Sequence, residues 1–355
     1  MSGRRLPSDA RPAGGRRLAF GVLCAVCVLV AGGYAGMAAW RARAATGAPG
    51  VAVAASGALA EAAARPHLVF LSTAVGESYG KVALVPLDAP DGPRYATALQ
   101  CDRVYGGTSA GLCLGNNVLG GFLSSYSAYT FDAAFEPRHT FNRNGIPTRV
   151  RISPDGRYGV TTVFVTGDSY AAGGFSTRTT LIDIASGALV GDLEEFAVWR
   201  DGERVQAPDF NFWGVTFARD SNRFYTTLGT GGKAYLMEGD VAGRQGRLLR
   251  ENVECPSLSP DGTRLVFKKH VSNDARSRWQ LHLLDLATMT ETPLANEPRS
   301  IDDQVEWLDD AHILYGWADE GPPRTTATSV WVLPVDGTEP ARVFLSQAYS
   351  PAVVR

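Results

Sequence analysis

The first pattern along the chain is a long uncharged segment near the N-terminus. Residues Leu18 to Trp40 (LAFGVLCAVCVLVAGGYAGMAAW) contain no charged side chain over twenty-three positions. At a rise of about 1.5 Å per residue, a helix of this length covers a bilayer hydrocarbon core of about 30 Å. The segment therefore predicts one transmembrane helix over residues 18–40.

The charges around this segment predict its orientation. Five arginines and one aspartate precede it, and only Arg41 and Arg43 follow it closely. Because basic residues favour the cytoplasmic side, residues 1–17 are expected to form a cytoplasmic basic tail. The helix would then be a single-pass signal anchor in the cell membrane, with the rest of the chain extracytoplasmic. A cleaved signal peptide is the alternative, since Ala42-Arg43-Ala44 resembles a cleavage site, and the protein would then be secreted.

After the apolar segment the pattern changes twice. Residues 41–65 are rich in Ala, Gly and Val without apolar periodicity, which predicts a flexible linker. From Pro66 onward, short runs of alternating or β-branched residues are separated by Gly, Pro, Asp and Asn turns, as in HLVFLST, KVALVPL, YGVTTVFV, RLVFKK and SVWVLPV. Helical periodicity is nearly absent there. Residues 66–355 are therefore predicted to be all-β.

An internal repeat specifies the kind of β-fold. VRISPDGRYGVTTVF begins at Val150 and PSLSPDGTRLVFKKH at Pro256, with degenerate copies from Val215 and Val305. In each clear copy, Pro fixes φ at the turn, Asp bonds back to the local backbone, and Gly takes the positive φ that closes a hairpin. Repeats of about 40 to 50 residues are typical of β-propellers. The chain is predicted to form about six four-stranded blades.

The two ends of the repeat region are incomplete in complementary ways. HLVFLST, which starts at His67, resembles the second strand of a blade without its first strand. SQAYSPAVVR at the C-terminus resembles a first strand, with Pro351 in the place of Pro256. The C-terminal strand is expected to complete the first blade and close the ring, which hides strand edges. WRDGERVQAPDFNFW (199–213) is expected to be an inserted loop.

The segments SPDGRYGV and SPDGTRLVF resemble the WD40-like repeats of the TolB family. The resemblance covers residues 66–355 and implies a six-bladed propeller of the kind found in periplasmic and exported bacterial proteins. The periplasmic member of that family is an adaptor in an envelope-spanning protein assembly and carries a separate N-terminal α/β domain. Here a predicted membrane segment stands in place of that domain, so the adaptor's specific partners do not transfer.

Charge excludes one class of partner. The chain has 34 Lys and Arg and 36 Asp and Glu; without the seven arginines and one aspartate of residues 1–43, 27 basic and 35 acidic residues remain, a net charge of −8. Binding to nucleic acid requires a basic surface that neutralises phosphates. Nucleic acid is therefore not an expected partner.

The sequence offers weak signals for catalysis and metals. Gly107-Thr108-Ser109-Ala110-Gly111 matches G-x-S-x-G, but strand sequence follows where a nucleophile elbow needs a helix. A glycine-rich hairpin turn is the preferred interpretation. The five histidines are scattered singly, and neither a His or Cys pair nor an acidic loop has metal-ligand spacing. No catalytic residue, metal or cofactor is predicted.

One mouth of the predicted channel is the candidate binding site. The densest acidic group, and the polar and aromatic residues of the 199–213 insertion, are expected to line that mouth. The residues are Asp302, Asp303, Glu306, Asp209, Asn211 and Trp213. Such residues suit a cation or a sugar, although acidic turns also serve solubility. Phe210 and Phe212 could join a binding patch or pack between blades.

Three cysteines follow the apolar segment. Cys101 and Cys113 flank VYGGTSAG, which reads as a tight hairpin turn. A hairpin can bring its arms within the roughly 4.4 to 6.8 Å Cα separation of a disulfide, and exported domains meet oxidising conditions. A Cys101–Cys113 disulfide is predicted, with Cys255 as the odd thiol; three buried thiols are the alternative.

These observations together favour a binding protein. The expected function is a non-enzymatic, membrane-tethered scaffold or sensor of the cell envelope, whose partner is a protein or an envelope polymer. The alternative is a propeller hydrolase or lyase that acts on carbohydrate through carboxylates at the channel mouth. Glycoside hydrolysis would need two carboxyl groups about 5 to 9.5 Å apart.

Overall fold

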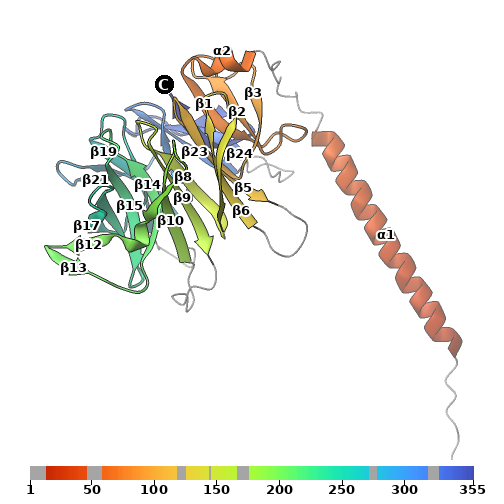
Figure 1. The fold of residues 1–355 in the computed structure, drawn as a ribbon. Helices are drawn as coiled ribbons and strands as arrows, with labels where there is room; N and C mark the ends of the chain where they lie inside the picture. The colour runs from red at the N-terminus through yellow and green to blue at the C-terminus, as the bar shows by residue number, and fades with distance from the viewer. Residues whose placement is uncertain are drawn as a thin grey trace, which may run out of the picture. The chain divides into compact units, whose positions relative to one another are not determined.

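The computed structural model describes residues 13–45, 58–117, 125–143, 145–165, 176–271, 278–318 and 328–355. It divides into two compact units, residues 1–50 and 51–355 (Figure 1). The first unit contains α1 (Ala13–Ala45), so the helix extends beyond the predicted 18–40 at both ends. Its Phe20–Met37 segment is long and apolar enough to cross a membrane, a property that signal sequences share. Residues 1–12 of the predicted basic tail lie outside the described residues.

The second unit confirms the six-bladed β-propeller. In each blade the strands are given from the centre of the ring outward. Blade 1 contains β26 (Ala348–Val354), β1 (His67–Ser72), β2 (Lys81–Pro86) and β3 (Tyr95–Gln100). Blade 2 contains β4 (Arg103–Gly106), β5 (Ala110–Asn117), β6 (Ser125–Asp132) and β7 (Pro137–Arg143). Blade 3 contains β8 (Ile146–Ile152), β9 (Tyr158–Val165), β10 (Ser176–Asp183) and β11 (Leu189–Asp192).

The remaining three blades repeat this pattern, with one extension. Blade 4 contains β14 (Asn211–Phe217), β15 (Arg223–Thr230), β16 (Lys233–Asp240) and β17 (Gln245–Glu251), extended by β12 (Ala197–Arg200) and β13 (Glu203–Val205). Blade 5 contains β18 (Glu254–Leu258), β19 (Arg264–Val271), β20 (Arg278–Asp285) and β21 (Glu291–Pro293). Blade 6 contains β22 (Glu306–Trp307), β23 (His312–Ala318), β24 (Thr328–Pro334) and β25 (Arg342–Leu345).

The predicted turn chemistry is present in the repeat. Ser259 Oγ donates to Asp261 Oδ1 over 2.6 Å, and that carboxylate accepts the backbone N–H of Thr263 at 2.9 Å. Burial acts to raise the pKa of Asp261, but the bonds from Ser259 and Thr263 lower it to about 2. Gly262 has φ +77°, which an L side chain would strain. The same bonds recur at Ser153 and Asp155, so the turn is encoded locally.

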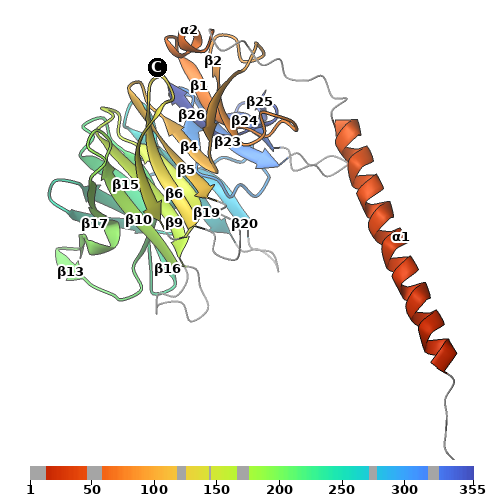
Figure 2. The same ribbon diagram turned by 45° about the vertical axis from the view of Figure 1, so that its right-hand side comes forward.

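The C-terminal strand closes the ring as predicted. β26 pairs with β1 in antiparallel register, from His67 opposite Val354 to Ser72 opposite Ala348 (Figure 2). Ala352 and Val354 are buried in a core cluster with blades 1 and 2. The two ends of the propeller sequence therefore form one blade.

Two predicted boundaries differ from the structure. The predicted flexible linker, residues 41–65, contains α2 (Leu59–Ala63), whose Ala62 is buried against blade 1. This helix is stabilised by packing of its apolar side chains against blade 1, and five residues are too few to show a helical periodicity in the sequence. Residues 46–57 of that linker lie outside the described residues.

The predicted loop at 199–213 is also partly wrong. Its first half forms the β12–β13 hairpin, and β12 pairs in parallel with β17, with Ala197 opposite Gln245. Phe212 lies on β14, the inner strand of blade 4, and is fully buried. The insertion thus widens blade 4 rather than forming a loop, because the open edge of β17 offers unpaired backbone groups.

The inner strands define two faces of the propeller. All six run in the same direction, and we call the face where they begin the start face. The opposite face carries the Pro-Asp-Gly turns and is called the turn face. One central cavity reaches the turn face at Pro154 and Pro260, and a second lies closer to the start face, at Arg103 and Arg149.

Candidate functional site

The start face carries an open pocket between blades 4 and 5, with a volume of about 680 Å³. We call it the start-face pocket. It lies where β14 and β18 begin and where β15 and β16 meet in the Gly231-Gly232 turn. Its lining includes Asp209, Asn211, Trp213, Lys233, Glu251, Asn252, Glu254, His270 and Trp279.

Two adjoining β-bulges position the innermost side chains of this pocket. The register of β14 shifts between Trp213 and Thr216, and that of β18 shifts between Glu254 and Ser257. Gly214 has φ +68°, and a Cβ there would lie 2.5 Å from the Cα of Cys255. Bulges re-aim side chains. The two bulges therefore pack against each other and leave Trp213 and Glu254 in the pocket wall.

The two tryptophans of the pocket are held by different contacts. The ring of Trp213 lies on the backbone of Gly229, where a Cβ would meet its ring carbons at 2.7 Å. Trp279 donates from Nε1 to Glu254 Oε1 over 3.3 Å, and Lys268 Nζ lies 4.9 Å from the Trp279 ring centroid. A cation over an indole face is a favourable contact. Both rings are thereby fixed while they line one cavity.

The predicted residues Asp209 and Asn211 hold the pocket wall together. Asp209 accepts bonds from Thr230 Oγ1 at 2.6 Å and from Gly231 N at 2.7 Å. The bond from Thr230, followed by that from Gly231, lowers the pKa of Asp209. Asn211 accepts the backbone N–H of Thr177 at 2.8 Å. Both side chains line the start-face pocket between blades 4 and 5, and both fix the backbone around Trp213.

The predicted acidic group divides among three environments. Asp302 forms an ion pair with Lys268, beside the start-face pocket. Asp303 accepts the backbone N–H of Gly316 at 3.1 Å and lines a narrow part of the channel with space of only about 30 Å³. Glu306 lies deeper and also borders the cavity at the turn face. The six predicted residues therefore do not form one cluster.

Glu306 belongs to a buried network at the centre of the ring. Arg151 Nη1 donates to Glu306 Oε2 over 2.7 Å, and Tyr105 Oη donates to Oε1 over 3.1 Å. The backbone N–H of Val353 donates to the same carboxylate at 3.2 Å. Burial raises the pKa of Glu306, and the Arg151 guanidinium opposes that rise. The network joins blades 1, 2, 3 and 6.

Sequence reasoning missed the basic lining of the channel. Arg149 and Arg151 alternate on β8, so both point to one face of the strand. Arg149 Nη2 donates to the backbone oxygen of Asp302 at 3.3 Å, and the Arg103 guanidinium lies 4.6 Å from the Tyr349 ring centroid. The R-x-R spacing before the Pro-Asp-Gly turn was the available signal. These arginines lie beside the channel carboxylates, and Arg151 forms an ion pair with Glu306.

The G-x-S-x-G segment lies in a β-hairpin of blade 2. The G-x-S-x-G match is the turn between β4 and β5, where Gly107 N donates to Ala110 O over 2.8 Å. Within the part of the chain that the structure describes, no group of three or more His, Cys, Asp or Glu side chains could hold a metal ion. The glycine-rich hairpin interpretation is therefore confirmed.

One carboxyl outside the predicted set has an altered acidity. Burial raises the pKa of Glu194 to about 8, and the nearby Asp192 adds to this rise. Glu194 accepts the backbone N–H of Thr179 at 3.2 Å, beside a 360 Å³ pocket under the β12–β13 hairpin. Because the folded pKa is raised, its contribution to stability is complete below about pH 4.5 and is lost as pH rises through about 8. Nothing in the sequence near Glu194 indicates this burial.

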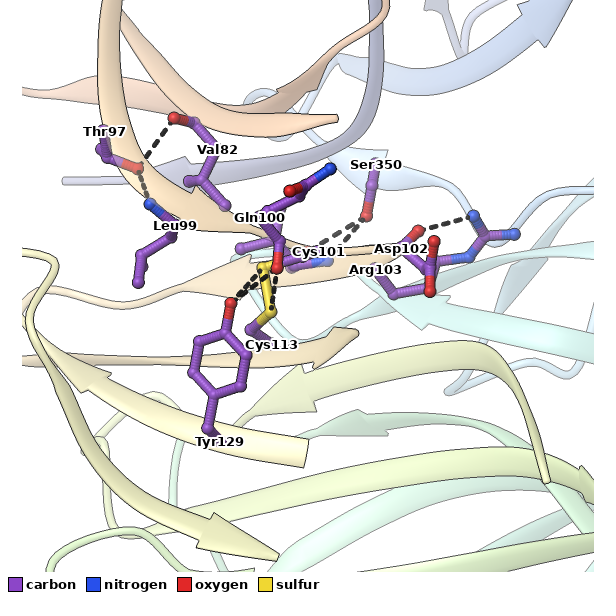
Figure 3. Close-up of a disulfide and its surroundings, with 11 residues drawn as sticks. Val82, Thr97, Leu99, Gln100, Cys101, Asp102, Arg103, Cys113, Tyr129 and Ser350 are labelled. Atoms are coloured by element: carbon purple, nitrogen blue, oxygen red, sulfur yellow. Dashed lines mark hydrogen bonds between the residues drawn. A yellow bond between two sulfur atoms is a disulfide. The ribbon is translucent and has the colours of Figure 1, made fainter. Parts of the chain in front are cut away.

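The structure brings the predicted cysteine pair together. Cys101 and Cys113 lie with their Cα atoms 5.7 Å apart and their sulfur atoms at bonding distance (Figure 3). Cys101 precedes β4 and Cys113 lies on β5, so the link fastens the crossing from blade 1 to the hairpin of blade 2. Tyr129 Oη donates to the Gln100 carbonyl at 2.7 Å beside it. Cys255 is buried and free.

We expect the pair to be oxidised in exported protein. Mass spectrometry of non-reduced, alkylated full-length protein from membranes should give a linked peptide pair containing Cys101 and Cys113. Closing so short a loop stabilises the fold by about 3 kcal/mol, so a Cys101→Ser/Cys113→Ser variant should melt several degrees lower. Cys255→Ala is the control and should keep the linked pair. Alkylated Cys101 in exported wild-type protein would contradict the pairing.

Comparison with known proteins places the fold. No family profile matches this sequence, and no curated protein sequence matches it. TolB from Acinetobacter baumannii is 13% identical over 82% of this chain and 67% of its own, with a TM-score of 0.54. A chain of a nidogen/laminin complex is 12% identical over 81% of this chain and 98% of its own, with a TM-score of 0.50.

An oligogalacturonate lyase from Vibrio parahaemolyticus is 8% identical over 72% of each chain, with a TM-score of 0.47. At these identities the similarity concerns the fold alone, since one propeller fold hosts unrelated functions. The chain is a six-bladed β-propeller, structurally similar to TolB and other propellers, that follows an N-terminal apolar helix.

Proposed function

We propose that this protein is a non-enzymatic, membrane-tethered propeller that binds a protein or polymer of the cell envelope at its start face, as a scaffold or sensor. The observation that carries the proposal is the start-face pocket. It combines about 680 Å³ of open volume with two fixed indole rings and polar groups, within the range of ordinary ligand sites.

The compartment rests on two further features. Helix α1 contains an uncharged segment of membrane-spanning length, and arginines dominate the sequence before it. The Cys101–Cys113 pair suits an oxidising compartment. The disulfide measurement described above therefore also tests whether the propeller leaves the cytoplasm.

The channel carboxylates support binding over catalysis. Asp302 is paired with Lys268 and Glu306 with Arg151, and Asp303 caps a backbone N–H. A general acid needs a raised pKa and access to substrate. Glu306 has the first property, but it is buried among its partners. The carbohydrate hydrolase or lyase alternative therefore has less support.

Site-specific photo-crosslinking of the full-length protein in its membrane tests the choice of face. A photoreactive residue at Lys233, on the rim of the start-face pocket, is expected to give adducts with an envelope component. The same residue at Glu339, exposed on the turn face between β24 and β25, is the matched control and should give none. Adducts from position 339 alone, or none from position 233 in folded protein, would refute the proposed face.

A further inference from the structure

The geometry of the start-face pocket points to a saccharide ligand: we propose that it binds a short segment of an envelope glycan built from neutral or amino sugars. The inference rests on the function proposed above and names the chemistry of the ligand. The features that favour a saccharide are two indole rings, one carboxylate, the charge of the lining, and a short connection in blade 4.

The aromatic surface comes from two different blades. Trp213 belongs to the inner strand of blade 4, and Trp279 belongs to the third strand of blade 5. Each ring is held in place, by Gly229 beneath Trp213 and by Lys268 and Glu254 around Trp279. Pyranose rings present a face of C–H groups, which packs against the electron-rich face of an aromatic ring. Rigid tryptophans in one cavity suit this contact.

The polar part of the pocket can order sugar hydroxyls. Glu254 Oε1 accepts the Trp279 Nε1–H, and among the described residues its Oε2 has no hydrogen-bond partner. A carboxylate oxygen is an acceptor for two or more hydroxyl donors. Next to it, Asn252 exchanges hydrogen bonds with the backbone of His270, which fixes the floor of the pocket. Glu254 is therefore the group best placed to meet a ligand.

The charge of the lining selects among saccharides. Asp209, Glu251 and Glu254 are acidic, whereas Lys233 is basic and already paired with Glu251 over 3.0 Å. An acidic lining repels uronic acids and other anionic sugars, since like charges in one cavity are unfavourable. Neutral sugars and amino sugars meet no such cost. The lining thus favours N-acetylated or free amino sugars over polyuronates.

In blade 4 the connection at the start face, beside this pocket, is short. In blade 4 the second and third strands are joined only by Gly231 and Gly232, because Thr230 pairs directly with Lys233. A polymer can reach Trp213 from the side of blade 4 without crossing a long connection in that blade.

Binding of defined trisaccharides to the full-length protein in detergent tests this assignment. Three ligands are titrated by calorimetry: N-acetylated chitotriose, its deacetylated form with free amino groups, and trigalacturonate. We expect saturable binding of a chitin-type trimer and at least tenfold weaker binding of trigalacturonate. Glu254→Gln and Trp213→Phe should each weaken binding by tenfold or more. Trp199→Phe, on the exposed β12–β13 hairpin, is the matched control and should leave binding unchanged. Melting curves verify that each variant is folded.

Two results would overturn the saccharide assignment. One is lack of binding of the chitin-type trimers at millimolar concentration by folded wild-type protein; the other is binding that Glu254→Gln and Trp213→Phe both leave unchanged. Tighter binding of trigalacturonate would overturn the selection by charge. These failures differ from failure of the proposed function: protease-sensitive, glycosidase-resistant adducts from position 233 would keep the start face as a binding face and reject the glycan.

Discussion

Deletion of residues 350–355 is expected to abolish the cooperative thermal unfolding of the propeller. The deletion removes most of β26, including buried Ala352 and Val354, and leaves β1 without its inner partner. It also removes Ser350, whose Oγ donates to the Val104 carbonyl at 3.1 Å. Loss of a closing strand should cost more than about 5 kcal/mol, comparable to the whole stability of a typical domain. Circular dichroism melting of the full-length chain measures it.

The control for this experiment is deletion of Arg355 alone, which follows β26. That variant loses one side-chain bond to the Leu308 carbonyl and should keep a cooperative transition. If the 350–355 deletion melts within a few degrees of wild type, the C-terminal strand does not close the ring in solution.

Replacement of Arg151 by Met is expected to destabilise the fold by about 3 to 5 kcal/mol, because it leaves the Glu306 carboxylate buried without its cation. Both side chains are less than a tenth exposed. An Arg151→Met/Glu306→Leu double variant should recover much of this loss, since both charges are then removed together. Urea unfolding of the two variants and of Glu306→Leu gives the coupling free energy.

An exposed ion pair provides the comparison. Lys233 and Glu251 form a salt bridge with roughly half-exposed side chains, and Lys233→Met should change stability by less than about 1 kcal/mol. Equal effects of Arg151→Met and Lys233→Met would show that the central network does not stabilise the ring.

Features encoded within a few consecutive residues could be predicted from the sequence. The Pro-Asp-Gly turns are closed by bonds within six residues, such as the one that the Arg264 N–H donates to Ser259 Oγ, so their spacing specified the blades. The incomplete first blade and the C-terminal strand specified closure. A twelve-residue separation across a glycine-rich turn was enough to predict the Cys101–Cys113 proximity. The apolar helix α1 could be predicted from the length of its uncharged segment alone.

The candidate site depended on contacts between distant segments. Asp302 and Glu306 stand four residues apart in sequence, yet one pairs with Lys268 and the other with Arg151 from another blade. Trp279 lines the pocket from the third strand of blade 5. The bulges at Gly214 and Cys255 pack together and place Trp213 and Glu254 in the same pocket wall. The hairpin that widened blade 4 depended on the open edge of β17. By itself, the sequence determined the strands, turns and ring because their bonds are local and repeat. Only the tertiary structure decided which charges are neutralised and which side chains meet in a pocket, because those pairings join blades far apart in the chain.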